Sequence, residues 1–511
     1  MTAAVLLSWL VVHSTPAPVS AFDLQTVIDK ARSLASESYQ APVVIPKFMR
    51  ELSYDQYQDI RFDPEKSLWR ESASRFQVML LPPGLFYTHP VTINIVDAQG
   101  VRALPFRRDL FTCDDPDLAK RIPPDLGYAG FKLTYPMHGA EVHNQFLVFA
   151  GASYFRAVGR DNAFGLSTRG LALDTGLPSG EEFPAFVEYW LVRPSPEAKE
   201  MVFYALLDSP SMTGAYAFTI TPGPTTNVVV KATIFARSPL KLPGFAPLTS
   251  MFYYGDNTAR PRGEWRRQVH DSDGLLIHDG TSGEWLWRPL LNPRTLEMDF
   301  FAVTNVRGFG LLQRDRDFRD YLDTEAQYHL RPSAWVRPLG DWGKGRVVLV
   351  QLPSPNETND NIVAFWTPAE PIAVGEPQSL DYTLQFGNAA IAGEPMGQAI
   401  KTLVGDGNRT GGGASAGAYR LIVDFAGGPL DRLTSRAKIV GSVTALEKGE
   451  VLDHYVEHVP SQHCWRLSIL AKPAAEGPLV LRAYLKREQE TLTETWTYRL
   501  AADNDIRKER D

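Results

Sequence analysis

The sequence predicts an all-β protein, in which a large antiparallel β-sandwich precedes a small immunoglobulin-like β-sandwich. From residue 75 onward, short segments rich in β-branched and aromatic residues are separated by Gly, Pro, Asn and Asp. No helical pattern of ten or more residues alternates with these segments, which argues against parallel βαβ units. The length of 511 residues exceeds what one hydrophobic core usually serves, so we expect two or more domains.

Composition excludes several classes of function. Hydrophobic residues make up 44% and charged residues 22% of the chain, as in an ordinary folded protein, and the net charge of -7 gives no basic surface for nucleic acid. Cys113 and Cys464 lie far apart, so two buried thiols are favoured over one bridge, and no metal-ligand cluster is expected. The chain has no P-loop, dinucleotide fingerprint or nucleophile elbow, and we expect no cofactor.

The N-terminal residues 1–21 have the pattern of a secretory signal. The run AAVLLSWLVV is too short to span a bilayer, and Val19-Ser20-Ala21 fits the small residues before a cleavage site. No later apolar stretch reaches membrane-spanning length. We therefore expect an exported chain that does not span the membrane once mature. Residues 22–39 then predict an amphipathic helix, with apolar residues at helical spacing and Asp23 as its N-cap.

The large domain is predicted over residues 22–388. Its expected strands cover 75–81, 88–97, 130–137, 144–159, 185–193, 200–208, 214–223, 226–237, 275–280, 284–290, 296–305, 345–353, 361–368 and 379–387. The least strand-like part is the long polar loop 314–329. Residues 389–417 are rich in Gly and small residues, which is typical of a linker. Residues 418–511 carry about six further strands, enough for a small immunoglobulin-like domain.

The stretch from residue 265 to residue 366 concentrates tryptophan and acidic residues. Aromatic faces stack on sugar rings, and Asp, Glu, Arg and Asn bind hydroxyls, so such a site suits a carbohydrate. The alternative interpretation is that these Trp form core and the acids lie in turns. The candidate sugar-binding residues are Trp285, Trp287, Trp335, Trp342, Arg288, Arg331 (of the pair Arg331-Pro332) and Asn359.

Carboxylates are the reactive groups that this stretch offers. Inverting cleavage of a glycoside needs one carboxylic acid and one carboxylate, about 6.5–9.5 Å apart. Asp271 and Asp273 lie in one loop, and Glu357 and Asp360 lie in another that is distant in sequence. The two loops would make a catalytic pair if they faced each other across one groove. Each acid taken singly is also consistent with a role in a turn or cap.

Several long motifs resemble the periplasmic glucan biosynthesis proteins G and D. They are HDSDGL, GEWLWRPL, GFGLLQRDRDF, RPSAWV, GDWGKG and ETNDNIVAFW, together with YDQYQDIRF, LFYTHPV, the segment around FAGASYFRA, and ETWTYRL. The resemblance covers nearly all of the chain after residue 21, with drift mainly toward the C-terminus. It implies a large sandwich similar to the galactose mutarotase type, joined to a small immunoglobulin-like domain, in the periplasm of a Gram-negative bacterium.

The resemblance also implies a chemistry. Members of this family act on β-1,2-glucan as inverting endo-glucanases or as transglycosylases that cyclise the chain. The general acid would be Asp360 of the ETND motif. The general base would belong to the HDSD motif, at Asp271 or alternatively at Asp273. Tyr328 and Glu357 would support proton transfer or orient the acid.

The favoured hypothesis is a periplasmic enzyme that processes β-1,2-glucan without a metal, by hydrolysis or by transglycosylation. The alternative is a non-catalytic glucan-binding scaffold that works with a membrane glucan synthase. The signal has neither a basic n-region nor a twin-arginine pair, so the export route does not separate the G type from the D type.

Overall fold

The computed structural model describes residues 22–139, 141–407, 417–474 and 477–500. The predicted signal, residues 1–21, lies outside the described residues. The all-β prediction is confirmed, because strands dominate and helices are short. No helix within these ranges is long and apolar enough to cross a membrane.

The helices are α1 (Leu24–Ser36), α2 (Lys47–Arg50), α3 (Tyr54–Gln58), α4 (Pro116–Arg121) and α5 (Phe318–Tyr321), with 3-10 turns η1 (Pro64–Lys66), η2 (Arg70–Ser72), η3 (Arg108–Leu110), η4 (Tyr328–Leu330), η5 (Ala389–Ala392), η6 (Gly428–Arg432) and η7 (Pro460–Gln462).

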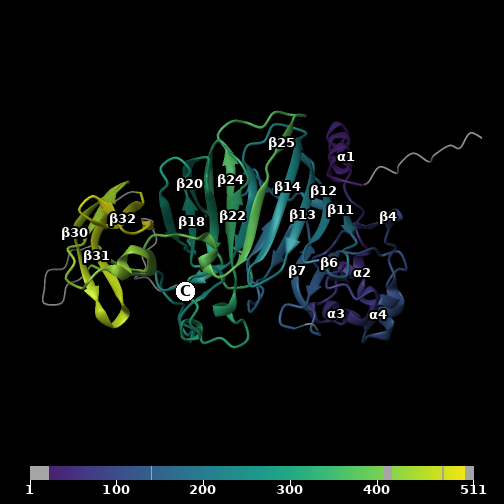
Figure 1. The fold of residues 1–511 in the computed structure, drawn as a ribbon, viewed down its shortest axis with the longest axis horizontal. Coiled ribbons are helices and arrows are strands. Elements are labelled where there is room, and N and C mark those ends of the chain that lie inside the picture. The colour runs from purple at the N-terminus through teal and green to yellow at the C-terminus, as the bar shows by residue number, and fades with distance from the viewer. Residues whose placement is uncertain (1–21, 140, 408–416, 475–476, 501–511) are drawn as a thin grey trace, which may run out of the picture.

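Helix α1 forms as its sequence predicts. The Asp23 side chain accepts a hydrogen bond from the amide of Thr26 at 3.1 Å and so caps the first turn. Val27 and Ala31 are fully buried, and they pack against Trp190 and Phe235 on the outside of the larger sheet. Figure 1 shows this helix lying beside strands β11 to β14. Its role is to cover one face of that sheet.

Two large sheets make up most of the described chain (Figure 1). The ten-stranded sheet has the order β2 (Gln77–Leu81), β6 (Gly130–Tyr135), β7 (Asn144–Ala150), β8 (Tyr154–Ala157), β9 (Ser167–Arg169), β15 (Pro243–Ser250), β24 (Ile362–Pro368), β23 (Lys344–Gln351) and β20 (Glu297–Thr304), with β10 (Leu171–Leu173) also pairing β15. The sixteen-stranded sheet has the order β29 (Val440–Ala445), β32 (Leu479–Arg487), β34 (Thr495–Leu500), β19 (Trp285–Pro289), β18 (Gly274–His278), β21 (Gly308–Leu312), β22 (Ser333–Pro338), β26 (Tyr382–Gly387), β14 (Thr226–Ala236), β13 (Met212–Thr221), β12 (Met201–Asp208), β11 (Ala185–Val192), β3 (Thr92–Asp97) and β4 (Gly100–Ala103), with β25 (Pro377–Ser379) beside β14 and β33 (Glu490–Thr491) beside β32.

The main hydrophobic core lies between these two sheets, because it takes buried residues from both. Phe149 on β7 contacts Phe203 on β12 and Phe218 on β13, with ring centroids 5.1 Å apart in each pair. Most strand pairs are antiparallel, as predicted; β3 with β11 and β19 with β34 are parallel. The two remaining small ladders are β1 (Ile60–Phe62) with β5 (Phe111–Cys113), and β16 (Phe252–Tyr254) with β17 (Val269–His270).

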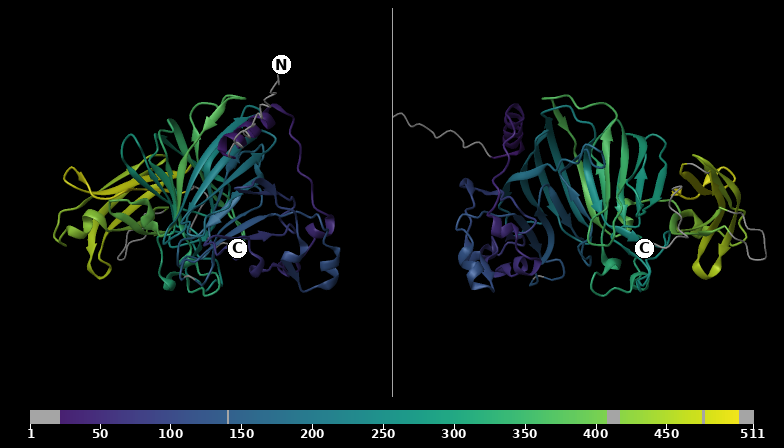
Figure 2. Two further views of the ribbon diagram at one scale, coloured as in Figure 1. Left: turned by 45° about the vertical axis from the view of Figure 1, so that its right-hand side comes forward. Right: turned by 180° about the vertical axis from the view of Figure 1, so that it is seen from behind.

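The C-terminal strands enclose a second core at one end of the molecule, while α2 to α4 lie at the other end (Figures 1 and 2). A four-stranded sheet has the order β27 (Gln398–Asp406), β28 (Tyr419–Ala426), β31 (Cys464–Pro473) and β30 (Gly449–Val459). Buried Leu421 and Leu467 of this sheet belong to the same core as Leu481 of β32. Cys113 and Cys464 are both free thiols. The likeness to the galactose mutarotase and immunoglobulin types stays a prediction.

The segment predicted as a linker contains a strand. Within 389–417, residues 398–406 form β27, which pairs with β28 along its whole length. The Gly-rich part at 408–416 lies outside the described residues. The register shifts between Ala399 and Lys401, a bulge that re-aims the side chains around it. Small residues predicted a linker locally, whereas backbone pairing with β28 makes the segment a strand of the C-terminal sheet.

Candidate active site

The predicted base segment HDSD lies along the start of strand β16. The amide of Asp271 donates a hydrogen bond to the carbonyl of Met251 at 2.8 Å. After His270 the chain bends instead of continuing as a strand. In a regular strand Asp271 and Asp273 would point to the same face. Because of the bend, the two carboxyl groups reach different surroundings.

The predicted acid segment ETND is fastened to the same place. The side-chain amide of Asn361 accepts a hydrogen bond from the Phe252 amide at 2.9 Å and donates one to the Phe252 carbonyl at 3.0 Å. Asp360 immediately precedes Asn361. Met251 therefore holds the loop of Asp271, and its neighbour Phe252 holds the loop of Asp360. One dipeptide brings together two loops that are distant in the sequence.

Asp271 is a buried carboxyl with one cationic neighbour. Its Oδ1 lies 3.1 Å from Nη1 of Arg331, and the residue is 5% exposed. Burial, opposed by Arg331 and Arg156 and assisted by the charge of Asp360, raises the pKa of Asp271 to about 6. Asp271 is thus close enough to Asp360 for the two charges to interact. A carboxyl of this pKa is mostly ionised at neutral pH and exchanges its proton readily.

Asp360 lies on the exposed side of the pair. The residue is exposed, and partial desolvation by the neighbouring protein raises its pKa, while Arg156, Arg169 and Arg331 oppose that change. Arg156 is on β8 and Arg169 is on β9. The charge of Asp360 also raises the pKa of Tyr154 on β8. The acid therefore faces strands of the ten-stranded sheet, with three guanidinium groups around it.

Tyr328 lies between the two carboxylate-bearing loops. It is 3% exposed, and burial raises its pKa well above the usual value, with further contributions from Glu357 and Asp271. The guanidinium of Arg331 lies over the Tyr328 ring at 5.0 Å. Glu357 is held by Arg266, with contacts of 3.0 and 2.7 Å to its two oxygens. Tyr328 is therefore a neutral phenol near both Asp271 and Glu357.

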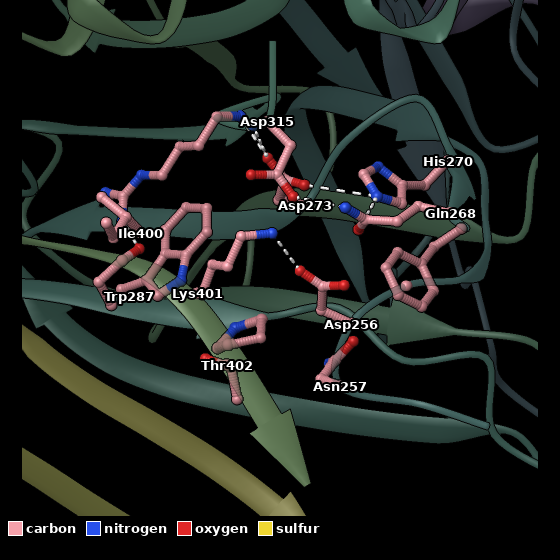
Figure 3. A pocket seen from close by; sticks show the side chains of 15 residues that line it. Asp256, Asn257, Gln268, His270, Asp273, Trp287, Asp315, Ile400, Lys401 and Thr402 are labelled. Atoms are coloured by element: carbon pink, nitrogen blue, oxygen red, sulfur yellow. Dashed lines mark hydrogen bonds and ion pairs between the residues drawn. The ribbon is translucent and has the colours of Figure 1, made fainter. Parts of the chain in front are cut away.

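Asp273 faces a separate polar pocket, shown in Figure 3. Its Oδ2 accepts hydrogen bonds from the backbone amides of Arg314 and Asp315, and its Oδ1 lies 3.5 Å from Nε2 of His270. Burial raises the pKa of Asp273 to about 6 and that of Asp315 to about 7. Lys401 of β27 enters the same pocket and donates a hydrogen bond to Asp256 at 2.6 Å. The Asp273 carboxylate thus organises the backbone at this pocket.

The motif resemblance is confirmed by comparison with known proteins. The model of the family described as periplasmic glucan biosynthesis protein, MdoG, matches residues 22–500. This chain belongs to that family. Glucans biosynthesis protein G of Dickeya dadantii (strain 3937) is 41% identical over 98% of this chain and 97% of its own length. The proteins of the same name from Sodalis glossinidius and Ralstonia nicotianae are each 42% identical, over 95% and 94% of this chain and 94% and 96% of their own lengths.

Among solved structures, the Slr1438 protein from Synechocystis sp. PCC 6803 aligns with 69% of this chain and 98% of that one. The TM-score is 0.17 and the identity 9%. This similarity is too low to support an argument about fold or function.

The tryptophans of this family member are mostly core residues. Trp285, Trp287 and Trp335 are 8%, 3% and 1% exposed and belong to the core shared with the C-terminal strands. Protein covers their faces, since Trp285 stacks on His278 at 3.9 Å and Trp335 at 5.9 Å. The expected stacking of sugar on these three rings is therefore not supported; the alternative interpretation, that they are core, fits their burial.

The other candidate sugar-binding residues have mixed surroundings. Arg288 is 1% exposed and its Nη2 lies 2.8 Å from Asp299, so burial and pairing leave it unavailable to a sugar hydroxyl. Trp342 is half-buried against Trp366, with ring centroids 5.1 Å apart. Asn359 is exposed beside Asp360, and Arg331 contacts Asp271. Of the predicted binding residues, Arg331 and Asn359 lie at the carboxylate pair.

Sequence reasoning missed the cations that surround Asp360. Arg169 ends strand β9, which is Ser-Thr-Arg, and Arg156 lies within the short, mostly apolar strand β8. A charged residue inside such a strand is the signal that was available, because it must reach solvent or a partner. Arg156 also falls in the FAGASYFRA segment that carries the family resemblance, and Tyr154 lies two residues before it on the same face of β8.

Proposed function

We propose that this protein is a periplasmic enzyme that cleaves β-1,2-glucan, by hydrolysis with inversion or by transfer of the glucan chain to a sugar hydroxyl. Membership of the periplasmic glucan biosynthesis family supports the compartment and the polymer. The observation that carries the proposal is the electrostatic pairing of Asp271 and Asp360 around Arg331. Two carboxyl groups of raised pKa from separate loops are the groups that glycoside cleavage requires.

Asp360 takes the role of general acid. It protonates the glycosidic oxygen as the bond to the leaving sugar breaks. Neighbouring protein already raises its pKa, and a glucan chain bound over this exposed carboxyl excludes further water, which favours the protonated form. Arg156, Arg169 and Arg331 then stabilise the carboxylate that remains after the proton has left.

Asp271 takes the role of general base. It accepts the proton of the attacking water or sugar hydroxyl, and its pKa of about 6 leaves it ionised at neutral pH. Arg331 holds this carboxylate at 3.1 Å. Tyr328 lies near enough for the charge of Asp271 to act on it, and its hydroxyl passes a proton between the acceptor hydroxyl and that carboxylate. Glu357, held by Arg266, orients the phenol. Asp273, bound to backbone amides, keeps the loop in place.

The test is incubation of the purified mature chain with linear β-1,2-glucan, with products separated by size and by anomeric configuration. Asp360→Asn should lower turnover by at least about a hundredfold, the usual contribution of a general acid, and leave glucan binding nearly intact. Asp341→Asn is the matched control, since Asp341 is an exposed carboxylate elsewhere in the same stretch. Retained turnover in Asp360→Asn would refute the assignment of the acid.

The products distinguish the possible reactions. Short reducing products of inverted configuration indicate hydrolysis, and products without a reducing end indicate cyclising transfer. Binding of glucan without any turnover would favour the alternative of a non-catalytic scaffold that presents glucan to a membrane glucan synthase.

A further inference from the structure

A groove of ≈ 580 Å³ lies outside the candidate active site and shares no lining residue with it. Its walls come from residues 39–42, residues 86–91 and strand β11 with the residues just before it. Aromatic side chains surround it, and two of them are unusually exposed: Phe86 at 81% and Phe183 at 51%. Phe is among the residue types most often buried, and an exposed aromatic patch in a groove usually marks a binding surface.

Small residues leave this groove deep. Ala129, Gly151, Ala152 and Ala185 line it beneath the aromatic rings. Gly151 has φ +76°, and a Cβ there would lie 3.2 Å from the Tyr87 ring. A larger residue at this position would therefore be strained and would crowd that ring. The bottom of the groove is therefore open between aromatic side chains, a shape that accepts the apolar face of a sugar ring.

The lining has the polarity of a neutral carbohydrate site. None of the seventeen residues that line the groove is Asp, Glu, Lys or Arg. Hydrogen-bonding capacity is supplied by hydroxyls and an imidazole, those of Tyr39, Thr88 and His89 among them. An uncharged polyhydroxyl chain with apolar ring faces matches aromatic walls with scattered hydroxyls.

Arg169 joins the groove to the catalytic carboxylates. Its guanidinium lies 5.4 Å from the Phe183 ring centroid and 4.8 Å from that of Tyr154. Arg169 lowers the pKa of Asp360, and the charge of Asp360 raises the pKa of Tyr154. Nε of Arg169 donates a hydrogen bond to Thr249 Oγ1 at 3.0 Å, which holds the guanidinium in this position. Phe183 of the groove and Tyr154 near Asp360 therefore contact one buried guanidinium.

We propose that this groove is a distal binding site for the same glucan chain whose bond is cleaved at Asp360. The inference rests on the proposed function. Phe86 and Phe183 stack on sugar units remote from the scissile bond, so the protein binds long chains better than chains too short to reach the groove. Binding energy gathered there serves to position the chain across Asp271 and Asp360.

The test uses Asp360→Asn as the parent protein, so that glucan is bound and not consumed. Calorimetry compares long linear β-1,2-glucan with short β-1,2-oligosaccharides in the parent and in added Phe86→Ala and Phe183→Ala variants. Each variant should weaken the affinity for long chains by about tenfold, as expected for the loss of a stacking ring, and leave that for short chains unchanged. Both side chains are exposed, so folding should be preserved.

The matched control is Phe300→Ala, an exposed ring on β20 that is outside the groove, at 46% exposure. It should not change either affinity. Equal weakening for long and short chains, or no weakening for long chains, would overturn the proposal, and so would a parent that binds no long glucan. Turnover by the unmodified protein is measured in parallel. A protein that binds long glucan through Phe86 and Phe183 but never cleaves it would retain the groove and refute only the proposed reaction.

Discussion

Removal of the Arg314 guanidinium should destabilise the contact of the loop after β21 with β27 and with the residue before β34. Arg314 is buried, and it binds Glu494 at 2.6 and 2.9 Å and Glu394 at 3.2 Å. Its guanidinium also lies 3.6 Å from the centroid of the Trp287 ring. Burial and the neighbouring Glu494 raise the pKa of Glu394 to about 10, so Glu394 is protonated at neutral pH. Arg314 binds both carboxyl oxygens of Glu494 but only one of Glu394.

The magnitude follows from the burial of that pair. The Glu494 side chain has 0% exposure, so Arg314→Ala leaves a carboxylate without water and without a cation. Removing one partner of a buried ion pair costs about 3–5 kcal/mol. We expect a loss of about 4 kcal/mol in the free energy of unfolding. Arg314→Lys keeps the charge but loses the forked contacts and the stacking on Trp287, so its loss should be about half as large.

Urea unfolding at neutral pH, followed by tryptophan fluorescence, measures both losses. Arg107→Ala is the matched control: this arginine donates hydrogen bonds of 3.2 and 2.6 Å to the two oxygens of Asp109, but both side chains are more than half exposed. Its removal should leave the free energy of unfolding nearly unchanged, because water replaces the lost contacts. If Arg314→Ala were no more destabilising than Arg107→Ala, burial of the Glu494 carboxylate would not govern the stability of this region.

Three further predictions concern the proposed chemistry. The value of kcat/KM should fall as pH decreases through about 6, because the Asp271 carboxyl becomes protonated there and no longer accepts a proton; a flat profile across this range would exclude Asp271 as the base. Arg331→Gln removes a cation that lowers the pKa of Asp271, so this acid limb should move to higher pH, and an unmoved limb would show that Arg331 does not act on the base. Tyr328→Phe should lower kcat by about a hundredfold with unchanged glucan affinity, and an unchanged kcat would remove Tyr328 from the proton path.

Local signals predicted much of the fold. Helix α1 follows from the spacing of Val27 and Ala31 and from the Asp23 cap, both of which act within one turn. Most strands follow from β-branched runs between turn residues. Strand β27 was not predicted: Ile400, Thr402 and Val404 favour a strand, but the Gly-rich segments on both sides of β27 favoured a linker.

The candidate site was predictable in part. The HDSD and ETND motifs indicated Asp271, Asp273 and Asp360, since long motifs are read directly from the chain. The choice between Asp271 and Asp273 as base depended on a bend after His270. Trp285 was open to two interpretations, because the exposure of an aromatic ring depends on what packs over it.

The sequence by itself determined the strand-rich class, the capped helix α1 and the family, because these depend on residues close together in the chain or on motifs read directly from it. Tertiary structure alone decided which side chains meet. It brings Asp360 to Asp271 through Met251 and Phe252, and it surrounds Asp360 with Arg156 and Arg169 from other strands. It also buries the tryptophans beneath the C-terminal strands. Burial, pKa and charge pairing depend on neighbours supplied by distant parts of the chain, and no local pattern encodes those neighbours.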